Sequence, residues 1–268
     1  MKANDQPHRA ILQSIAHQAM LDRGLLPDFS AAALAELGRL QAPAATDGGP
    51  VRDLRDLLWA SIDNDDSRDL DQLTVASAVP GDQIKILVAI ADVDSFVKNG
   101  SAIDEHAHHN TTSVYTAAEI FPMLPEKLSP DVTSLNFNED RLALVVEMVV
   151  GADGSIQESK IYRASVRNQA KLAYNRVAAW LEQNGVAPEA IVAVKGLAEN
   201  LRMQDRVTQS LKNFREIHGA LRLETIQAKP VFDGDQIRAL EIEEKNRAKE
   251  IMDSGRKPMS GSPVSARY

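Results

Sequence analysis

The nearly all-apolar run from Ile84 to Ala91 constrains the fold more than any other segment. It is too short and too rich in β-branched residues for a preferred helix, so it predicts a buried strand. A second strand is predicted from Leu142 to Val150, and the Asp153-Gly154 pair predicts a hairpin into Ile156 to Val166. Asp233-Gly234 predicts another hairpin. The chain is therefore expected to build a sheet with antiparallel pairing at both turns.

Helical stretches surround these strands. Tyr174 to Gln183 and Pro188 to Ile217 contain good helix formers and apolar residues at helical spacing. Ala10 to Leu21 and Ser30 to Leu40 have the same character near the N-terminus. Strands and helices thus come in blocks and do not alternate strictly. This order is typical of the α+β class and disfavours a doubly wound parallel sheet.

Changes in composition divide the chain into three predicted parts. Proline and glycine between Pro43 and Pro50 predict a linker, with a domain boundary near residue 48. Residues 1–47 are then a small helical N-terminal segment, and residues 48–252 are the main domain. Residues 253–268 are rich in Gly, Pro and Ser and are expected to form a disordered tail, like a frameshifted or truncated end.

The absence of cysteine limits the chemistry of the chain. Disulfides, thiolate nucleophiles and cysteine-ligated zinc are excluded, which leaves carboxylates, imidazoles and hydroxyls as reactive groups. No apolar run approaches the roughly 20 residues of a membrane span, so a cytoplasmic protein without membrane contact is expected. The net charge of −8 argues against a general nucleic-acid coat protein, because phosphate binding depends on Lys and Arg. Any nucleic-acid site must be local.

The segment from Ser61 to Gln72 holds half of the chain's net charge. Five aspartates and one arginine give it a formal charge of −4. Such crowding costs repulsion that a bound divalent cation removes, and Mg²⁺ prefers hard oxygen ligands. Asp69 and Asp71 would face the same side of an extended backbone, and Asp63 could return from the preceding strand. The segment predicts a carboxylate cradle of the kind used in two-metal phosphodiester cleavage.

Two other interpretations apply to this acidic segment. A solvated acidic turn is the ordinary meaning of a charge run. A calcium-binding EF-hand loop is disfavoured, because counting from Asp63 the sixth residue is Arg68 where glycine is needed. The twelfth residue is Thr74 where glutamate is needed. The acidic turn therefore stays open as the alternative to a magnesium site.

Three histidines gather in His106, His108 and His109. A helix would place His106 and His109 on one face and His108 on another, so this spacing does not suit a shared metal ion. We expect all three to be surface residues of a helix that leads into Thr112 to Tyr115.

Six motifs in one order carry a family resemblance. They are SIDNDDSRDLDQL at 61–73, VAIADV at 88–93, TSVY at 112–115, FPMLPEKLS at 121–129, SLN at 134–136 and EDRLALVVEM at 139–148. Over roughly Leu54 to Met252, the chain resembles the RNB domain of ribonuclease II and ribonuclease R. The resemblance implies an RNB-type fold and a hydrolytic exoribonuclease that threads single-stranded RNA 3′ end first. It also implies Mg²⁺ as cofactor, for which Mn²⁺ can substitute, and nucleoside 5′-monophosphates as products.

The resemblance assigns roles within the acidic segment. Asp63, Asp69 and Asp71 match three of the family's four active-site aspartates, of which the first and last usually contact metal. Asp69 and Asp71 are expected to take part in catalysis as well. The fourth position is Gln72, whose carbonyl can ligate Mg²⁺ weakly but brings no negative charge. Either Asp69 and Asp71 hold more of the metal, or the metal affinity is lower.

Two tyrosines and a basic strip are expected to contact RNA. Tyr115 matches a family tyrosine that packs near the terminal nucleotide at the catalytic centre, and Tyr174 matches one near the ribose. From Ser159 to Leu181 there is no acid, and basic residues alternate with aromatic ones, as where phosphates are tracked and bases stack. Arg167 and Lys171 are the expected phosphate contacts of this strip. An ordinary solvated hairpin face is the other interpretation.

The chain departs from the family at its flanks. No OB-type strands precede the resembling region and no S1 domain follows it. The resemblance stops where it enters a long helix, beyond which family members supply an acidic residue and an arginine near the scissile phosphate. Because lost electrostatic contacts of this kind slow catalysis by orders of magnitude, little exonuclease activity is expected of the 268-residue chain alone. A non-catalytic RNA-binding or partner-binding remnant of the fold is the alternative function.

Overall fold

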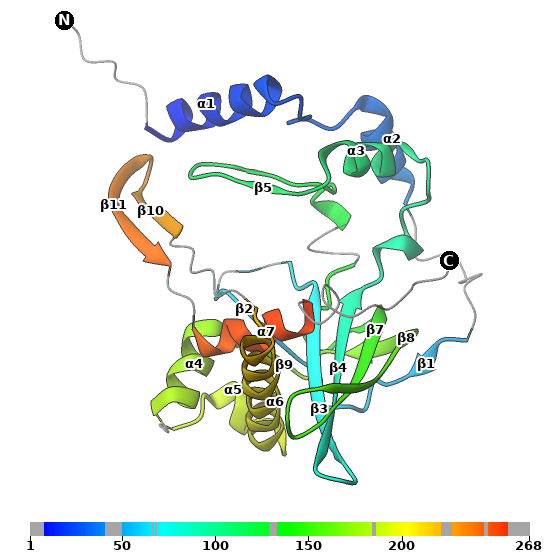
Figure 1. Cartoon of the computed structure of the whole chain (residues 1–268). Helices are drawn as coiled ribbons and strands as arrows, with labels where there is room; N and C mark the ends of the chain where they lie inside the picture. The colour runs from blue at the N-terminus through cyan, green and yellow to red at the C-terminus, as the bar shows by residue number, and fades with distance from the viewer. Residues whose placement is uncertain are drawn as a thin grey trace, which may run out of the picture. The chain divides into compact units, whose positions relative to one another are not determined.

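The structure, a computed structural model, groups the chain into two compact units, each described by itself (Figure 1). It describes residues 8–40, 50–65, 67, 69–128, 133–183, 186–220, 227–243 and 246–256. Unit 1 comprises Met1–Thr46, Val93–Val132 and Glu224–Glu244, and unit 2 comprises Asp47–Asp92, Thr133–Leu223 and Lys245–Tyr268. Met1–Thr46 of the predicted N-terminal segment fall in unit 1 together with two later segments. The predicted division of the chain into three parts stays a prediction.

Unit 2 is built on a sheet of seven strands in the order β1-β8-β7-β4-β3-β2-β9. The strands are β1 Arg52–Asp53, β2 Ala60–Asp63, β3 Gln72–Val79, β4 Gln83–Ala91, β7 Asp140–Val150, β8 Ile156–Arg167 and β9 Ala170–Ala173. Pairing is antiparallel from β8 to β2, and the two outer strands, β1 and β9, pair in parallel. The predicted strands and the hairpin at Asp153-Gly154 are confirmed.

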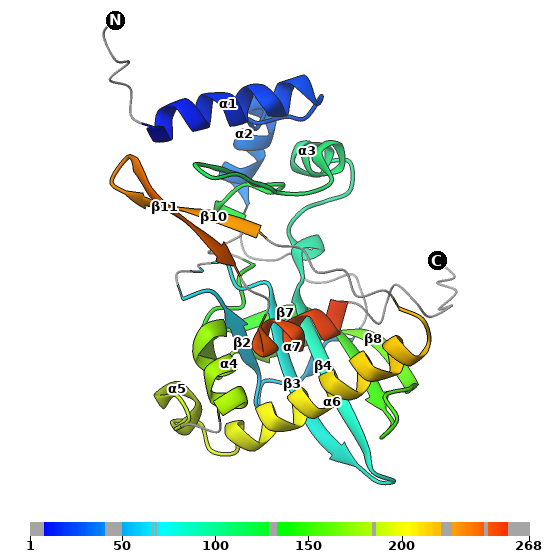
Figure 2. The same cartoon turned by 60° about the vertical axis from the view of Figure 1, so that its left-hand side comes forward.

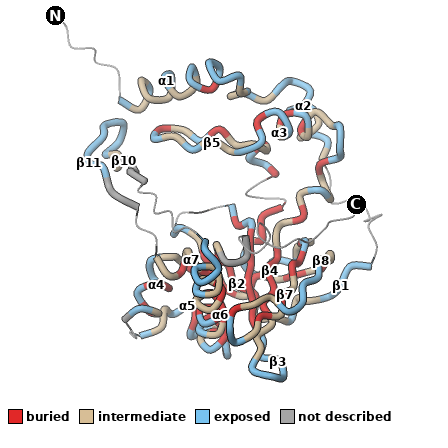
Figure 3. The backbone as a smooth tube through the Cα atoms, in the orientation of Figure 1, coloured by how far each residue is buried: buried red, intermediate tan, exposed pale blue. Residues whose placement is uncertain are grey.

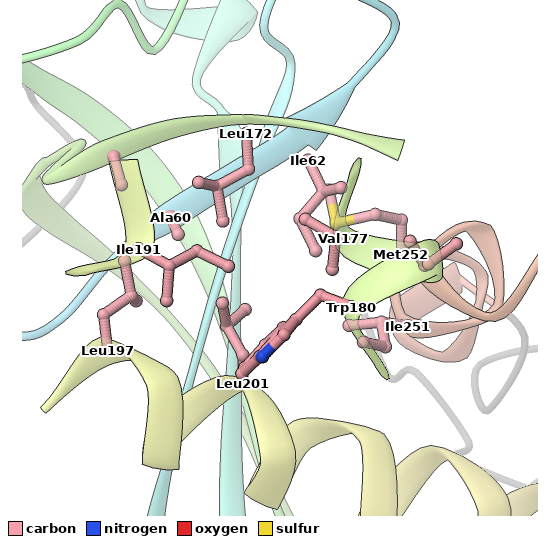
Figure 4. Packing of buried hydrophobic residues seen from close by; sticks show 13 residues of the cluster. Ala60, Ile62, Leu172, Val177, Trp180, Ile191, Leu197, Leu201, Ile251 and Met252 are labelled. Atoms are coloured by element: carbon pink, nitrogen blue, oxygen red, sulfur yellow. The ribbon is translucent and has the colours of Figure 1, made fainter. Parts of the chain in front are cut away.

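Four helices of unit 2 cover one face of this sheet (Figure 2). They are α4 Tyr174–Gln183, α5 Glu189–Val192, α6 Leu197–Ile217 and α7 Arg247–Arg256. In the core between them, Trp180 from α4, Leu201 from α6 and Ile251 from α7 meet Ile62 of β2 (Figure 4). This packing of helices on a largely antiparallel sheet confirms the α+β class.

The opposite face of the sheet has its own core. Leu73 and Val75 of β3 pack there with Leu87 and Ala89 of β4 and with Trp59. Because successive side chains of a strand point to opposite faces, Gln72 of β3 points toward the helices. Buried residues concentrate in the central strands of unit 2 (Figure 3). The two faces of β3 therefore separate the side chains of residues that are neighbours in sequence.

Unit 1 combines helices with two short hairpins. Its elements are α1 His8–Asp22, α2 Ala31–Arg39, the 3₁₀ helix η1 Val93–Ser95, α3 Ala102–Asn110, β5 Val114–Tyr115, β6 Ile120–Phe121, β10 Gln227–Asp233 and β11 Gln236–Glu243. Ala33 of α2 and Ile103 of α3 are central to its core. The two N-terminal helices and the hairpin at Asp233-Gly234 were predicted and are confirmed. Among the described residues of both units, no helix is long and apolar enough to cross a bilayer.

The prediction that all three clustered histidines lie at the surface is wrong for His106. This side chain is buried, and its ring centroid lies 4.1 Å from that of Phe29. Ile103, His106 and Asn110 form the inward face of α3, while His108 and His109 are exposed. Burial, followed by the charge of His109, lowers the pKa of His106. His106 and His109 were predicted to share one face of the helix, but of the two only His106 is buried.

Two predicted helix boundaries also differ from the structure. The helix predicted from Pro188 to Ile217 is divided, because Gly196 takes a left-handed conformation with φ of 88° before α6 begins. α7 continues to Arg256, beyond Asp253, where the tail was predicted to begin. Residues 257–268 of that tail lie outside the described residues.

Candidate functional site

The acidic segment connects the ends of two neighbouring strands, β2 and β3. Asp63 is the last residue of β2, and Asp71 directly precedes β3. The strands are antiparallel, with Ala60 opposite Thr74. Carried along both strands toward the loop, this register sets Asp63 and Asp71 at matching positions.

Asp71 continues the ladder between β3 and β4. Its carbonyl oxygen accepts a hydrogen bond of 3.0 Å from the N–H of Ala91, one residue beyond the pair Gln72 and Ile90. The residue is exposed, as is Asp69. Asp63 is half-buried, and its Oδ1 accepts a hydrogen bond of 2.7 Å from the N–H of Asn64. Carboxylates therefore stand at this end of the sheet on a fixed backbone.

Two cations from β9 and α4 reach the acidic segment. Lys171 lies beside Ser61 in the parallel ladder of β9 and β2, and its Nζ donates a 2.6 Å hydrogen bond to the Ser67 carbonyl oxygen. Arg176 Nη2 lies 3.7 Å from Asp65 Oδ1, an exposed pair that contributes little to stability. Lys171, predicted to contact phosphate, thus holds the loop in this structure. Its RNA-binding role stays a prediction.

Gln72 lies on the other face of the sheet from Asp71. Its side chain is buried, and Nε2 donates a hydrogen bond of 3.0 Å to the carbonyl oxygen of Met252 in α7. The neighbouring Asp71 must point to the opposite face, because side chains alternate along a strand. The structure therefore does not bring the Gln72 amide together with the Asp71 carboxylate. The role of Gln72 as a metal ligand stays a prediction. The burial of its side chain on the other face of the sheet does not favour that role.

The donor set of the segment matches a hard cation in its chemistry. Carboxylate oxygens are what Mg²⁺ prefers, and the half-buried Asp63 and the exposed Asp69 and Asp71 supply them. Among the residues that the structure describes, however, no three acidic or histidine side chains lie close enough to share one ion. Asp66 of the same segment falls outside the described residues. We conclude that the residue types fit Mg²⁺. Of the three aspartates, Asp63 and Asp71 lie at matching positions of the two neighbouring strands.

The two predicted RNA-binding tyrosines belong to different units. Tyr115 lies in the β5–β6 hairpin of unit 1, with 74% of the residue exposed. Tyr174 begins α4 in unit 2, directly after Ala173, which pairs with Asp63. The ring of Tyr174 packs partly against the core, and Lys249 Nζ lies 5.8 Å from its centroid. Tyr174 is thus placed at the acidic end of the sheet, and the role of Tyr115 stays a prediction.

The basic strip is paired with acids from elsewhere in the chain. Arg167 Nε donates a hydrogen bond of 2.6 Å to Asp140 Oδ1, and Arg55 Nη1 donates one of 2.9 Å to the other oxygen. The hydrogen bonds from Arg167 and Arg55 lower the pKa of Asp140 to about 2. Arg163 Nε likewise donates a hydrogen bond of 2.8 Å to the buried Asp92. Acidic side chains from distant parts of the sequence thus lie beside the basic strip. The role of Arg167 as a phosphate contact stays a prediction.

Asp92 was missed as a candidate, although it lies within the VAIADV motif. It is buried at the end of β4, and it directly follows Ala91, the residue that bonds to Asp71. Its ion pair with Arg163 of β8 anchors this end of the sheet. A buried charge is retained when it is paired, and the partner is 71 residues away in sequence. The motif could have indicated Asp92, but its partner could not have been found from spacing.

The family assignment rests on a match to most of the chain. The RNB domain matches residues 51–255. The chain belongs to the RNB domain family. Ribonuclease R of Vibrio cholerae is 35% identical over 202 residues, which cover 75% of this chain and 24% of that protein. Exoribonuclease 2 of Shigella flexneri is 35% identical over 175 residues, covering 64% of this chain and 27% of that protein. This RNB chain therefore spans about a quarter of the length of these curated relatives.

Solved structures share the RNB fold of this chain. RNase R of Mycoplasma genitalium, in complex with double-stranded RNA, has a TM-score of 0.81 at 23% identity and covers 94% of this chain and 44% of its own. Yeast Ssd1, described as a pseudonuclease, has a TM-score of 0.60 at 13% identity and covers 82% of this chain and 26% of its own. At these identities the similarity shows the fold alone.

We expect Gln72→Asp to destabilise this RNB chain at neutral pH, without tightening metal binding. The substitution would place a buried carboxylate near the Met252 carbonyl, and an unsatisfied buried charge costs about 1–3 kcal/mol or more. Gln72→Asn is the matched control, because asparagine has the same length as aspartate but keeps the uncharged amide. Urea unfolding with and without Mg²⁺ measures both variants. If Gln72→Asp were as stable as Gln72→Asn and bound Mg²⁺ more tightly, residue 72 would belong to the metal site.

Proposed function

We propose that this RNB chain is the metal-binding portion of a Mg²⁺-dependent exoribonuclease. The whole enzyme would hydrolyse single-stranded RNA from its 3′ end and release nucleoside 5′-monophosphates in the cytoplasm. The observation that carries the proposal is the acidic segment, in which Asp63 is the last residue of β2 and Asp71 directly precedes β3. Relatives named Ribonuclease R and Exoribonuclease 2 support the activity. Structures of Mycoplasma genitalium RNase R with double-stranded and ribose-methylated single-stranded RNA support RNA as the ligand.

Asp63, Asp69 and Asp71 would hold Mg²⁺, or Mn²⁺ in its place. When bound, the ion would reduce the repulsion among these carboxylates and lower the pKa of a water molecule that attacks the phosphodiester. The chain itself would position the carboxylates that hold the ion. Asp71 sits on a backbone that the ladder to β4 holds in place, so its carboxylate would need little rearrangement.

Four side chains would contact the RNA in this proposal. Tyr174, at the acidic end of the sheet, would pack against the ribose, and Tyr115 would stack on the terminal base. Lys171 and Arg167 would approach the phosphates. Both are held by protein oxygens here, so RNA phosphates would have to exchange with Ser67 and Asp140 as their partners.

A second function is favoured by one observation: among the described residues, no three acidic or histidine side chains lie close enough to share one ion. Fewer carboxylates around an ion attract it less. On this alternative the chain descends from an exoribonuclease and binds RNA or a protein partner without cleaving RNA.

A chimera distinguishes the two functions. Residues 51–255 would replace the matching segment of Escherichia coli Ribonuclease R, which is 32% identical to this chain over 214 residues. With 5′-labelled single-stranded RNA and Mg²⁺, we expect shortening from the 3′ end and release of nucleoside 5′-monophosphates. A folded chimera that binds RNA but releases no nucleotides at any Mg²⁺ or Mn²⁺ concentration would contradict the enzyme and favour the non-catalytic alternative.

A further inference from the structure

Leu70, which separates Asp69 from Asp71, is held on both sides of its backbone. It is buried, while the aspartates on both sides of it are exposed. Its N–H donates a hydrogen bond of 3.0 Å to Ser134 Oγ, and its carbonyl oxygen accepts one of 2.8 Å from the N–H of Leu135. Both main-chain polar groups of Leu70 are thus bound by two consecutive residues of a distant segment.

That distant segment, Ser134 to Asn136, is itself fixed. The buried Ser134 Oγ donates a hydrogen bond of 3.0 Å to Asn136 Oδ1, which leaves its lone pairs directed at the Leu70 N–H. Asn168 Nδ2 donates hydrogen bonds of 2.9 Å to the Leu135 carbonyl oxygen and 3.0 Å to Ser61 Oγ. The segment is therefore tied to β2, the strand that ends in Asp63.

We propose that Ser134 is a positioning residue for the metal-binding carboxylates. It contacts neither substrate nor metal, and it acts through Leu70. Fixing the N–H and carbonyl of Leu70 fixes the backbone on both sides of it, so Asp69 and Asp71 are held on the same side of an extended chain. Carboxylates held in place before the ion arrives lose less conformational entropy on binding. This inference rests on the proposed metal-binding function and adds the residue that preorganises its ligands.

The main alternative is that Ser134 contributes only to stability, as any buried hydroxyl does. Thr208 of α6 provides a matched comparison, because it is also buried and its Oγ1 donates a hydrogen bond of 2.9 Å to the Gln204 carbonyl oxygen. Thr208 lies on a helix and has no described contact with the acidic segment. Ser134→Ala and Thr208→Ala should therefore lower the free energy of unfolding by similar amounts. Of the two, only Ser134→Ala should weaken metal binding by the carboxylates.

The experiment measures two quantities on the 268-residue chain. The first is hydrogen exchange at the Leu70 amide without metal, and the second is Mn²⁺ affinity from electron paramagnetic resonance. In the wild-type chain the Leu70 amide should be protected. Ser134→Ala should speed its exchange by at least about ten-fold and weaken Mn²⁺ binding by about 10–100-fold, as loss of a residue that orients metal ligands generally does. Thr208→Ala should change neither quantity.

The outcomes separate this inference from the proposed function. Unprotected Leu70 in the wild-type chain would overturn the inference without any variant, even if Ser134→Ala failed to fold. Equal Mn²⁺ affinity in the wild-type chain and in Ser134→Ala would overturn the inference as well. A wild-type chain that binds no Mn²⁺ would instead overturn the proposed metal site, and the inference with it. Equal effects of Ser134→Ala and Thr208→Ala would leave Ser134 a purely structural residue.

Discussion

Replacing Asp71 by asparagine in the chimera is expected to lower the rate of RNA degradation by at least about a hundred-fold. The substitution keeps the size and the backbone hydrogen bond from Ala91 but removes one negative charge where the metal is proposed to bind. Since the missing carboxylate orients metal and water, excess Mg²⁺ should not restore the rate. The measurement is a Mg²⁺ titration of nucleotide release from single-stranded RNA.

Asp65→Asn is the matched control for this prediction. Asp65 lies in the same acidic segment and carries the same charge, but it is exposed and paired with Arg176. Its replacement should change the rate by less than about three-fold, because exposed ion pairs contribute little. Rates equal to those of Asp71→Asn, or rescue of Asp71→Asn by excess Mg²⁺, would contradict the role assigned to Asp71.

Gly154→Ala should lower the free energy of unfolding of unit 2 by about 3 kcal/mol or more. Gly154 lies in the turn between β7 and β8 with φ of +86°, and an added Cβ would come within 2.2 Å of the Ser210 carbonyl oxygen in α6. The backbone at Ser210 belongs to a helix and cannot move without disturbing its packing. Urea unfolding of the 268-residue chain, followed by tryptophan fluorescence, measures the loss.

Gly81→Ala separates the two causes of this loss. Gly81 lies between β3 and β4 with a similar φ of +83°, but nothing lies within 4 Å of its added Cβ. It should cost only the conformational part, about 1–2 kcal/mol. If the two variants lost equal stability, the close approach of the hairpin to α6 would not matter.

Strands were the most predictable part of the fold. The apolar run from Ile84 to Ala91 became β4 almost unchanged, because a central strand is buried on both faces and its sequence records this. The Asp153-Gly154 hairpin could be predicted for a local reason, the need for a positive φ, which Gly154 meets.

Contacts between distant segments could not be predicted. Asn200 of α6 shows why: its amide accepts a hydrogen bond of 3.1 Å from the N–H of Ala76 and donates one of 2.7 Å to its carbonyl oxygen. A side chain thus takes the place of a neighbouring strand, and no periodicity encodes this. The burial of His106 against Phe29 depends in the same way on how α3 meets the residues that precede α2.

The candidate site was predictable in residue type but not in arrangement. Charge density pointed to the acidic segment, and spacing together with the family resemblance pointed to Asp63, Asp69 and Asp71 within it. The separation of Gln72 from Asp71 follows from strand alternation, but it required knowing where β3 begins. The acids that pair with Arg163 and Arg167 are Asp92, which follows β4, and Asp140 of β7, so the basic strip looked more positive in sequence than it is.

Mn²⁺ binding to the 268-residue chain tests the central claim, that the carboxylates of the acidic segment form a divalent-cation site. Free Mn²⁺ is counted by electron paramagnetic resonance in titrations of the wild type, Asp71→Asn and Asp65→Asn. The account predicts binding by the wild type, affinity weakened by at least about ten-fold in Asp71→Asn, and nearly unchanged affinity in Asp65→Asn. Equal affinity in the wild type and Asp71→Asn would contradict it.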